Sequence, residues 1–213
     1  CEDSEKDYDM SIESQLPDEA KRNELKIKYV KLDKKVSIGE KRNICVENAS
    51  NDIIVCMDDD DYYPPKRVEH AVSSLRNSVK EMAGCSNHII YETDINALFQ
   101  FKRFGPNHSV NNAFAYKKSY IDSGAVYDST KKHAEEKNFL NDYKTPMIQL
   151  DPLETIIQMV HFNNTYSKRH LLIKAGWMDE KTRNVHQISS QPHRFIPKDF
   201  LTKYINIHSY IKS

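Results

Sequence analysis

Four consecutive aspartates, Asp58 to Asp61, are the residues whose type and spacing point most directly to chemistry. Neighbouring carboxylates repel one another unless a positive charge lies close by. A hard divalent cation with oxygen ligands is the simplest compensation, and Mn²⁺ or Mg²⁺ held by one or two carboxylates together with phosphate oxygens fits such a cluster. An EF-hand calcium loop fits poorly, because its sixth position requires a glycine and holds Tyr63 here.

The position of the aspartates in the chain favours a ligand site over a solvated acidic loop. They follow the apolar run Ile53–Met57, which predicts a strand buried on both faces, as in a parallel sheet. Open α/β sheets place their ligands beyond the carboxyl ends of such strands. The acidic residues are therefore expected at the ligand-binding edge of a sheet.

Helices are predicted on both sides of this strand. Before it, Ser37-Ile38-Gly39-Glu40 matches a capping box, in which the serine and glutamate side chains satisfy free backbone N–H groups. That helix is expected to direct Ile44 and Cys45 toward the core. After the strand, Tyr62-Tyr63-Pro64-Pro65 suits a first helical turn. One apolar face of the second helix is formed by Val68, Ala71, Val72 and Leu75.

The rest of the chain continues to alternate strand and helix patterns. Strands are predicted at 25–32, 82–90, 97–101, 113–116 and 147–157. Helices are predicted at 117–123, 132–142 and 197–213. This order predicts an α/β fold with a central, mostly parallel sheet flanked by helices.

Composition narrows the class of protein. Of 213 residues, 38% are hydrophobic, which is enough to bury the core of one domain. The 31 Lys and Arg residues balance the 31 Asp and Glu residues, so a nucleic-acid partner is not expected. No apolar run is long enough for a transmembrane segment. The four cysteines lack metal-site spacing and predict buried, reduced thiols in a cytoplasmic protein.

Three motifs follow one another along the first two thirds of the chain. Ser37–Asn43 holds a glycine followed by Arg-Asn, Ile53–Pro64 holds the acidic strand end followed by aromatics and proline, and Ala134–Leu140 holds an acidic pair. Together they resemble the glycosyltransferases of family 2, which have the GT-A fold. The abundance of Lys, Asn and Ile is also similar to that of glycosyltransferases of large DNA viruses, such as those that build chlorovirus capsid glycans, which would act in the host cytoplasm.

The resemblance implies a metal-dependent enzyme. It would transfer a hexose from a UDP-sugar, with glucose as the first choice, to a hydroxyl of a glycan or glycoprotein acceptor, with inversion. It would consist of a nucleotide-sugar-binding half over 1–100 and an acceptor-binding half over 101–213. The family opens with a βα unit of about 30–40 residues before the position of Asp3, so the chain is expected to be a fragment of a longer protein.

The resemblance also assigns the donor side of the site. Asp60 is the first choice as ligand of Mn²⁺ or Mg²⁺, and Asp58 would bind the metal or the ribose hydroxyls. Asp59 and Asp61 would support these ligands, or Asp61 would cap the next helix. The register of the metal-binding pair within the run of four stays open.

The nucleotide would meet residues from two other segments. Asp3 is expected to accept the imide N–H of the uracil, as at the end of an early strand in the family. Arg42 would lie against the uracil or the phosphates, with Asn43 beside it.

The acceptor side rests on the third motif. Glu136 is the candidate general base that removes the proton of the acceptor hydroxyl. Glu135 is the adjacent alternative, and on a helix the two side chains point about 100° apart, so only one can face the sugar. His161 is a candidate for the metal or the diphosphate. The basic cluster Lys168–His170 is expected to be solvated.

Three other classes of protein share part of this pattern. A sugar-nucleotide pyrophosphorylase also uses an acidic metal site, but it carries a Gly-rich phosphate loop, and the five glycines here include no G-x-G. A metal-dependent phosphatase with an aspartyl nucleophile requires lysine and threonine loops that have no match. A catalytically silent nucleotide-sugar or glycan-binding module of the same fold stays open.

Overall fold

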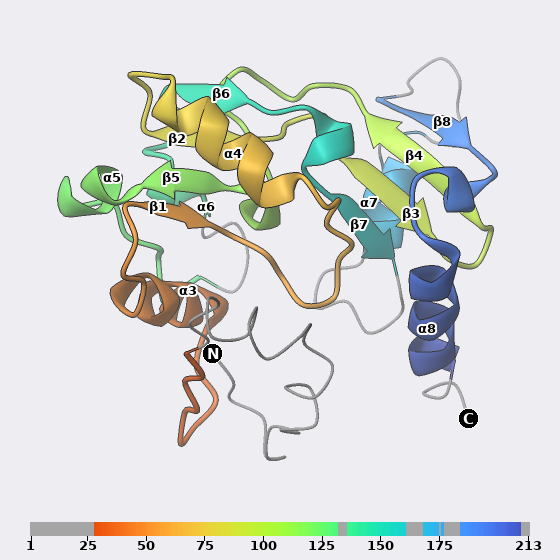
Figure 1. Ribbon diagram of the computed structural model, residues 1–213, viewed down its shortest axis with the longest axis horizontal. Coiled ribbons are helices and arrows are strands. Elements are labelled where there is room, and N and C mark those ends of the chain that lie inside the picture. The colour runs from red at the N-terminus through yellow and green to blue at the C-terminus, as the bar shows by residue number, and fades with distance from the viewer. Residues whose placement is uncertain (1–27, 132–135, 161–167, 175, 177–183, 210–213) are drawn as a thin grey trace.

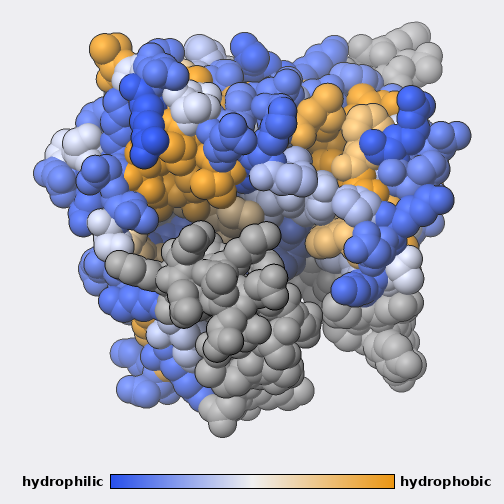
Figure 2. Space-filling view, in the orientation of Figure 1, coloured by the Kyte–Doolittle hydropathy of each residue, from blue (hydrophilic) through white to orange (hydrophobic). Residues whose placement is uncertain are grey.

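The computed structural model describes residues 28–131, 136–160, 168–174, 176 and 184–209. They form two four-stranded sheets with helices around them (Figure 1). Hydrophilic side chains cover most of the described part of the face in Figure 2, and apolar side chains show there in separate areas. The α/β class expected from the sequence is confirmed.

The first sheet has the strand order β1-β5-β2-β6. Its strands are β1 (Ile53–Val55), β5 (Ala115–Lys117), β2 (Met82–Gly84) and β6 (Met147–Gln149). β5 is antiparallel to both β1 and β2, whereas β2 and β6 are parallel. The strands β1, β2 and β6 therefore run in one direction, and their carboxyl ends lie at the same edge of the sheet.

The second sheet has the order β7-β3-β4-β8. Its strands are β7 (Ile157–Val160), β3 (Ile89–Glu92), β4 (Ala97–Phe101) and β8 (Val185–Ser189). Only β3 and β7 are parallel, and the pairs β3–β4 and β4–β8 are antiparallel. The sheets of the described residues are thus mixed, which corrects the expected mostly parallel pairing.

The packing of β1 explains why the residues before the aspartates form a continuous apolar run. Ile53 and Val55 pack on the side of the helix that follows, and Ile54 and Cys56 pack on the opposite side. Both faces are therefore covered, as predicted. The strand is nevertheless half-buried, because among the described strands β1 has a neighbour on one side only, and that neighbour is antiparallel.

The described residues also form six helices and three short 3₁₀ turns. The helices are α3 (Ile38–Glu47), α4 (Arg67–Arg76), α5 (Lys118–Asp122), α6 (Glu136–Phe139), α7 (Lys168–Lys174) and α8 (Lys198–Ser209). The 3₁₀ turns are η1 (Asn111–Ala113), η2 (Pro152–Glu154) and η3 (Pro192–Arg194). Within the described chain, no helix is both long and apolar enough to cross a membrane.

The two helices predicted beside β1 are present. Ser37 caps α3 by accepting a hydrogen bond from the backbone N–H of Glu40 at 3.1 Å. Ala71 and Leu75 of α4 are fully buried on the first sheet, whereas Val68 is 50% exposed and does not belong to the apolar face. Cys45 is exposed, so its predicted core position is wrong.

Most later elements also match their predictions. β4 has the predicted bounds, and α5 and α8 lie within theirs. The long strand patterns at 82–90 and 147–157 each divide into two strands, one for each sheet. Of the strand predicted at 25–32, residues 25–27 lie outside the described residues, and the described remainder forms only an isolated bridge at Lys31.

A buried carboxylate joins the two sheets. Asp61 lies in the loop after β1, and its side chain points into the protein, so that the residue is only 6% exposed. Its Oδ1 accepts hydrogen bonds from the backbone N–H of Met159 in β7 and from the Lys168 ammonium in α7, both at 2.8 Å. The Asn112 amide donates to Oδ2. The next residue, Tyr62, pairs with Ile157 of β7 through two backbone hydrogen bonds. The acidic loop is thus fixed to the second sheet.

A glycine lets α3 approach the backbone closely. A Cβ atom on Gly39 would lie 2.5 Å from the carbonyl oxygen of Asp128, which is part of the main chain and cannot rotate away. The glycine of the first motif therefore has a packing reason. It brings the following residues of α3 against the segment that contains Tyr127.

We expect Gly39→Ala to lower the free energy of unfolding by about 1–3 kcal/mol, since overpacking against rigid atoms has this cost. Urea unfolding followed by circular dichroism measures the change. Gly105→Ala is the matched control, because the nearest atom to a Cβ there is the His108 Cβ at 3.9 Å. An equal effect of the two substitutions would show that the close approach has no energetic weight.

The buried ion pair generates a second prediction, for Lys168→Met. Burial raises the pKa of Asp61 to about 6, and Lys168 opposes that rise. Removing the ammonium leaves a buried carboxylate without its cation, which is expected to lower the free energy of unfolding by about 3 kcal/mol at pH 8.

The loss should be smaller at pH 5. A folded-state pKa above the unfolded value means that folding takes up a proton as the pH falls through that range, and a neutral carboxyl no longer needs the lysine. Urea unfolding at both pH values measures this. Lys66→Met is the control, because the exposed pair of Lys66 with Glu154 contributes about 0.5 kcal/mol. A loss that is the same at pH 5 and pH 8 would contradict the role of the Asp61 charge.

Candidate functional site

Three of the four consecutive aspartates converge in space. Asp58, Asp60 and Asp61 each offer a carboxylate oxygen, and these oxygens all lie within 4.8 Å of one another. Asp59 is exposed and is not part of this group. Clustered carboxylate oxygens are the ligands that Mg²⁺ and Mn²⁺ prefer. The geometry therefore fits a hard divalent cation and favours the register that pairs Asp58 with Asp60.

Asp61 differs from Asp58 and Asp60 in that it is buried, and its oxygens accept hydrogen bonds from Met159, Lys168 and Asn112. It does not cap the following helix, since α4 begins after Lys66 with no side-chain cap. Asp61 therefore anchors the loop, and Asp58 and Asp60 are left as the better candidates for direct metal ligands.

Arg42 reaches the acidic loop from α3. Its Nη1 and Nη2 donate to Oδ1 and Oδ2 of Asp58 at 3.2 and 3.3 Å, which is the two-pronged geometry of a guanidinium and a carboxylate. The guanidinium also lies 5.9 Å from the centre of the Tyr127 ring. Burial alone would lower the pKa of Arg42, but the charge and hydrogen bonds of Asp58, with smaller contributions from Cys56 and Tyr127, together outweigh it and the pKa is raised. Arg42 is thus a fixed positive charge beside the candidate metal ligands.

Asn43, the next residue, is placed differently. Its amide nitrogen donates to the carbonyl of Tyr127 and its amide oxygen accepts from the N–H of Tyr127, both at 3.0 Å. Tyr127 in turn stacks on Phe139 of α6, with ring centres 4.0 Å apart. Asn43 therefore holds the segment that carries Tyr127 rather than offering its amide to a ligand.

Tyr63 shapes the loop from the other side. Its hydroxyl accepts a hydrogen bond from the backbone N–H of Asp58 at 2.7 Å and donates to the carbonyl of Asn112 at 3.2 Å. Burial raises the pKa of Tyr63, so its hydroxyl keeps its proton at neutral pH. This tyrosine fixes the backbone at the first aspartate.

Glu136 lies at the first position of α6. Its Oε2 accepts from the Asn111 amide and its Oε1 accepts from the Tyr143 hydroxyl, both at 3.3 Å. Asn111 and Asn112 are consecutive residues of η1, and Asn112 binds Asp61. The residue that binds the candidate base, Asn111, is thus the direct chain neighbour of Asn112, which binds the acidic loop.

Three predicted site residues, Asp3, Glu135 and His161, lie outside the described residues. The expectation of a solvated basic cluster is wrong for Lys168, whose side chain is only 14% exposed. Arg169 instead pairs with Glu92 and Asp94 at the end of β3. Asn112 carried no sequence signal, because a lone asparagine in a loop has no spacing that indicates a role.

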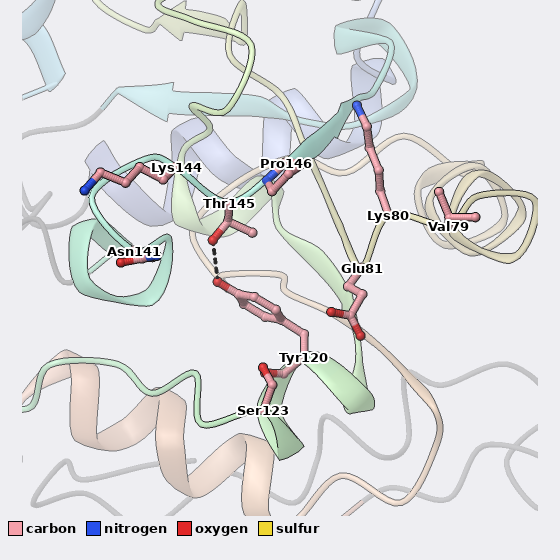
Figure 3. A pocket seen from close by; sticks show the side chains of 9 residues that line it. All are labelled: Val79, Lys80, Glu81, Tyr120, Ser123, Asn141, Lys144, Thr145 and Pro146. Atoms are coloured by element: carbon pink, nitrogen blue, oxygen red, sulfur yellow. Dashed lines mark hydrogen bonds between the residues drawn. The ribbon is translucent and has the colours of Figure 1, made fainter.

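A pocket of about 580 Å³ lies away from this site (Figure 3). It is lined by residues that precede β2 and β6, among them Lys80 and Pro146. A hydrogen bond of 2.9 Å between the Tyr120 hydroxyl and Thr145 Oγ1 lies within it. The pocket is therefore at the amino ends of β2 and β6, at the opposite edge of the first sheet from the acidic loop.

Comparison with solved structures supports the same fold. The mannosyltransferase PcManGT from Pyrobaculum calidifontis, solved with GDP-Man and Mn²⁺, matches with a TM-score of 0.52 and 12% identity over 70% of this chain and 44% of that one. Residues 1–349 of S. aureus TarS match with a TM-score of 0.52 and 14% identity over 71% of this chain and 48% of that one. This chain thus spans less than half the length of either structure.

These likenesses confirm the expected GT-A fold. No curated protein matches the chain. The family model described as glycosyl transferase family 2 matches residues 3–134, which is more than half of the sequence and includes the acidic loop and Arg42. The chain belongs to glycosyl transferase family 2.

Proposed function

We propose that this chain is the catalytic part of a metal-dependent glycosyltransferase that moves a hexose from a UDP-sugar, with glucose as the first choice, to a glycan hydroxyl with inversion. The observation that carries the proposal is the convergence of Asp58, Asp60 and Asp61 within 4.8 Å beyond the end of β1. Family membership supports the reaction class.

The donor side is built from the acidic loop and α3. Asp58 and Asp60 would hold the divalent cation, which supplies positive charge to the departing diphosphate. Arg42 adds a second positive charge next to Asp58, where it can face a phosphate. Asp61 and Tyr63 keep the loop in one conformation, so these charges are in place before the donor binds.

The acceptor side is built around Glu136. Its carboxylate would take the proton of the acceptor hydroxyl as that oxygen forms a bond to the anomeric carbon. The bond between the anomeric carbon and the diphosphate oxygen breaks in the same step, and UDP leaves with its electron pair. Two partners of Glu136, Asn111 and Tyr143, are neutral groups that orient the carboxylate without neutralising it.

The two sides support the expected division of the chain. The acidic loop and Arg42 lie within residues 1–100, and Glu136 with its partners lies within 101–213. PcManGT was solved with GDP-Man and Mn²⁺, which supports a divalent cation and a nucleotide-sugar donor here. The choice of uridine rests on the resemblance of Asp3 to the family's base contact, and a role for His161 at the metal or diphosphate rests on resemblance as well.

The cellular setting is also a proposal. Cys45, Cys56 and Cys85 are free thiols, which is usual in a reducing compartment, so we retain the cytoplasmic location. The resemblance to viral enzymes gains no support, since the two matched structures come from Pyrobaculum calidifontis and S. aureus.

A catalytically silent binding module is the second candidate, and one observation favours it. Arg42 occupies both oxygens of Asp58, so an internal cation could serve where the metal is proposed. Such a module would bind a nucleotide sugar without turnover and without a need for Mn²⁺.

Asp60→Asn tests the metal site. Thermal shift with UDP, with and without Mn²⁺, should show metal-dependent stabilisation of the unaltered protein. The variant should bind Mn²⁺ and UDP at least about tenfold more weakly, as loss of a metal ligand or its support does. Asp59→Asn is the matched control, because Asp59 is exposed and outside the converging group. Equal stabilisation by UDP in EDTA would overturn the metal-dependent function.

Glu136→Gln tests the base. The variant should keep its affinity for UDP and Mn²⁺, and its turnover of UDP-sugar should fall by about 10²–10⁴-fold, the usual contribution of a general base. Glu135→Gln should leave turnover close to normal. Release of UDP from a UDP-sugar panel measures both variants. A silent module would show no turnover to lose, and a loss in Glu135→Gln alone would move the base to the neighbouring residue.

A further inference from the structure

A strip of aromatic rings leads across the surface to Glu136. The rings of Phe104 and His108 have centres 5.0 Å apart, and those of His108 and Tyr143 have centres 5.3 Å apart. The Tyr143 hydroxyl then donates to Glu136 Oε1 at 3.3 Å. We call Phe104, His108 and Tyr143 the aromatic strip. Its last member is in direct contact with the candidate base.

The strip is open to solvent at one end and supported from below. Phe104 is 52% exposed and is the one exposed phenylalanine of the described chain. Its other side lies on the buried rings of Phe101 and His88, with centres 5.7 and 6.4 Å away. Burial lowers the pKa of His108, so its ring is neutral at pH 7 and stacks as an ordinary aromatic group. Phe104 thus offers one face of a firmly supported ring to solvent.

Two side chains hold the backbone of the strip in place. Ser86, two residues after β2, accepts from the N–H groups of Phe104 and Gly105 at 2.8 and 3.2 Å. Gln149, the last residue of β6, donates to the carbonyls of Pro106 and His108, both at 3.0 Å. Because β2 and β6 run in the same direction as β1, these anchors lie at the sheet edge where the acidic loop begins.

Tyr143 is held in a strained conformation. Asn141, Asp142 and Tyr143 have φ angles of 48°, 55° and 59°, which is a left-handed turn without glycine. Asparagine and aspartate tolerate this region, but a bulky aromatic residue in it is an outlier. Strain of this kind persists where the surrounding structure fixes it, and it gathers at functional sites. Here the strain places the Tyr143 ring on His108 and its hydroxyl on Glu136.

We propose that the aromatic strip is the platform for the acceptor sugar, a suggestion that rests on the proposed function. An aromatic ring offers an apolar face to the C–H face of a pyranose, while the adjacent carboxylate takes a hydroxyl. Phe104 and His108 would bind the ring of the acceptor. Tyr143 is a positioning residue that orients Glu136. The nucleotide, in contrast, would lie on the Arg42 side of the acidic loop.

Binding of methyl glycosides tests the platform directly. Methyl α- and β-glycosides of glucose, galactose, mannose and N-acetylglucosamine are added with UDP and Mn²⁺, and saturation-transfer NMR reports which molecules contact the protein. We expect at least one glycoside to bind, and Phe104→Ala to weaken it about two- to tenfold, the range of an aromatic contact. Phe104→Tyr should retain binding. Ile95→Ala, which removes another half-exposed apolar side chain, is the control.

The outcomes separate this proposal from the function itself. UDP and Mn²⁺ binding without contact to any glycoside, or glycoside binding unchanged in Phe104→Ala, would overturn the platform and leave the donor site intact. Weaker UDP binding in Phe104→Ala would assign the strip to the nucleotide and also overturn it. No binding of UDP or Mn²⁺ would overturn the proposed function instead.

Tyr143→Phe tests the last ring separately. It keeps the stack on His108 and removes the hydrogen bond to Glu136. Turnover of UDP-sugar should fall several-fold while glycoside binding stays unchanged, because the bond to Glu136 orients the base and does not contact the acceptor. A change in glycoside binding with unaltered turnover would contradict the positioning role.

Discussion

The site depends on the buried carboxylate of Asp61. One loop residue of the first sheet is tied to the backbone of β7, to the Lys168 ammonium and to the Asn112 amide. A charge this deeply buried is stable only with such partners, so all three must be in place together. The consequence is that Asp58 and Asp60 are not on a free loop. They project from a segment that is fixed at its next residue to a second sheet.

Two cations from outside the acidic run pair with its carboxylates. Lys168 balances the buried aspartate and Arg42 balances the first one, both from helices outside the acidic run. Each of these two cations therefore offsets the negative charge of one carboxylate of the acidic run. Glu136 accepts hydrogen bonds from two neutral donors, Asn111 and Tyr143. These bonds orient the carboxylate, and a general base has to remain able to accept a proton.

Local patterns predicted what local physics determines. The Ser37 cap, the two-faced packing of Ile53–Cys56 and α4 all follow from short-range sequence, whereas Met57 at the end of the apolar run is 49% exposed. The direction of β5 could not be read, because pairing between distant segments leaves no periodicity in either one. The positions of Lys168 and Asn112 could not be read for the same reason, since both meet Asp61 from far along the chain. The motif resemblance indicated Arg42 and Asn43 together. Only the contacts in the structure show that Arg42 places a charge beside the site, whereas Asn43 fixes the backbone at Tyr127.

The left-handed turn at 141–143 bears on how this sequence can change over generations. A tyrosine in that conformation costs roughly 1–2 kcal/mol, and glycine would relieve this strain. At position 143 the backbone conformation therefore favours glycine, while the packing of the ring and the bond of the hydroxyl favour tyrosine. The two pressures oppose each other at a single backbone position. A glycine there would relieve the backbone but would also remove the packing of the ring, so a substitution for heat tolerance at this position carries both effects.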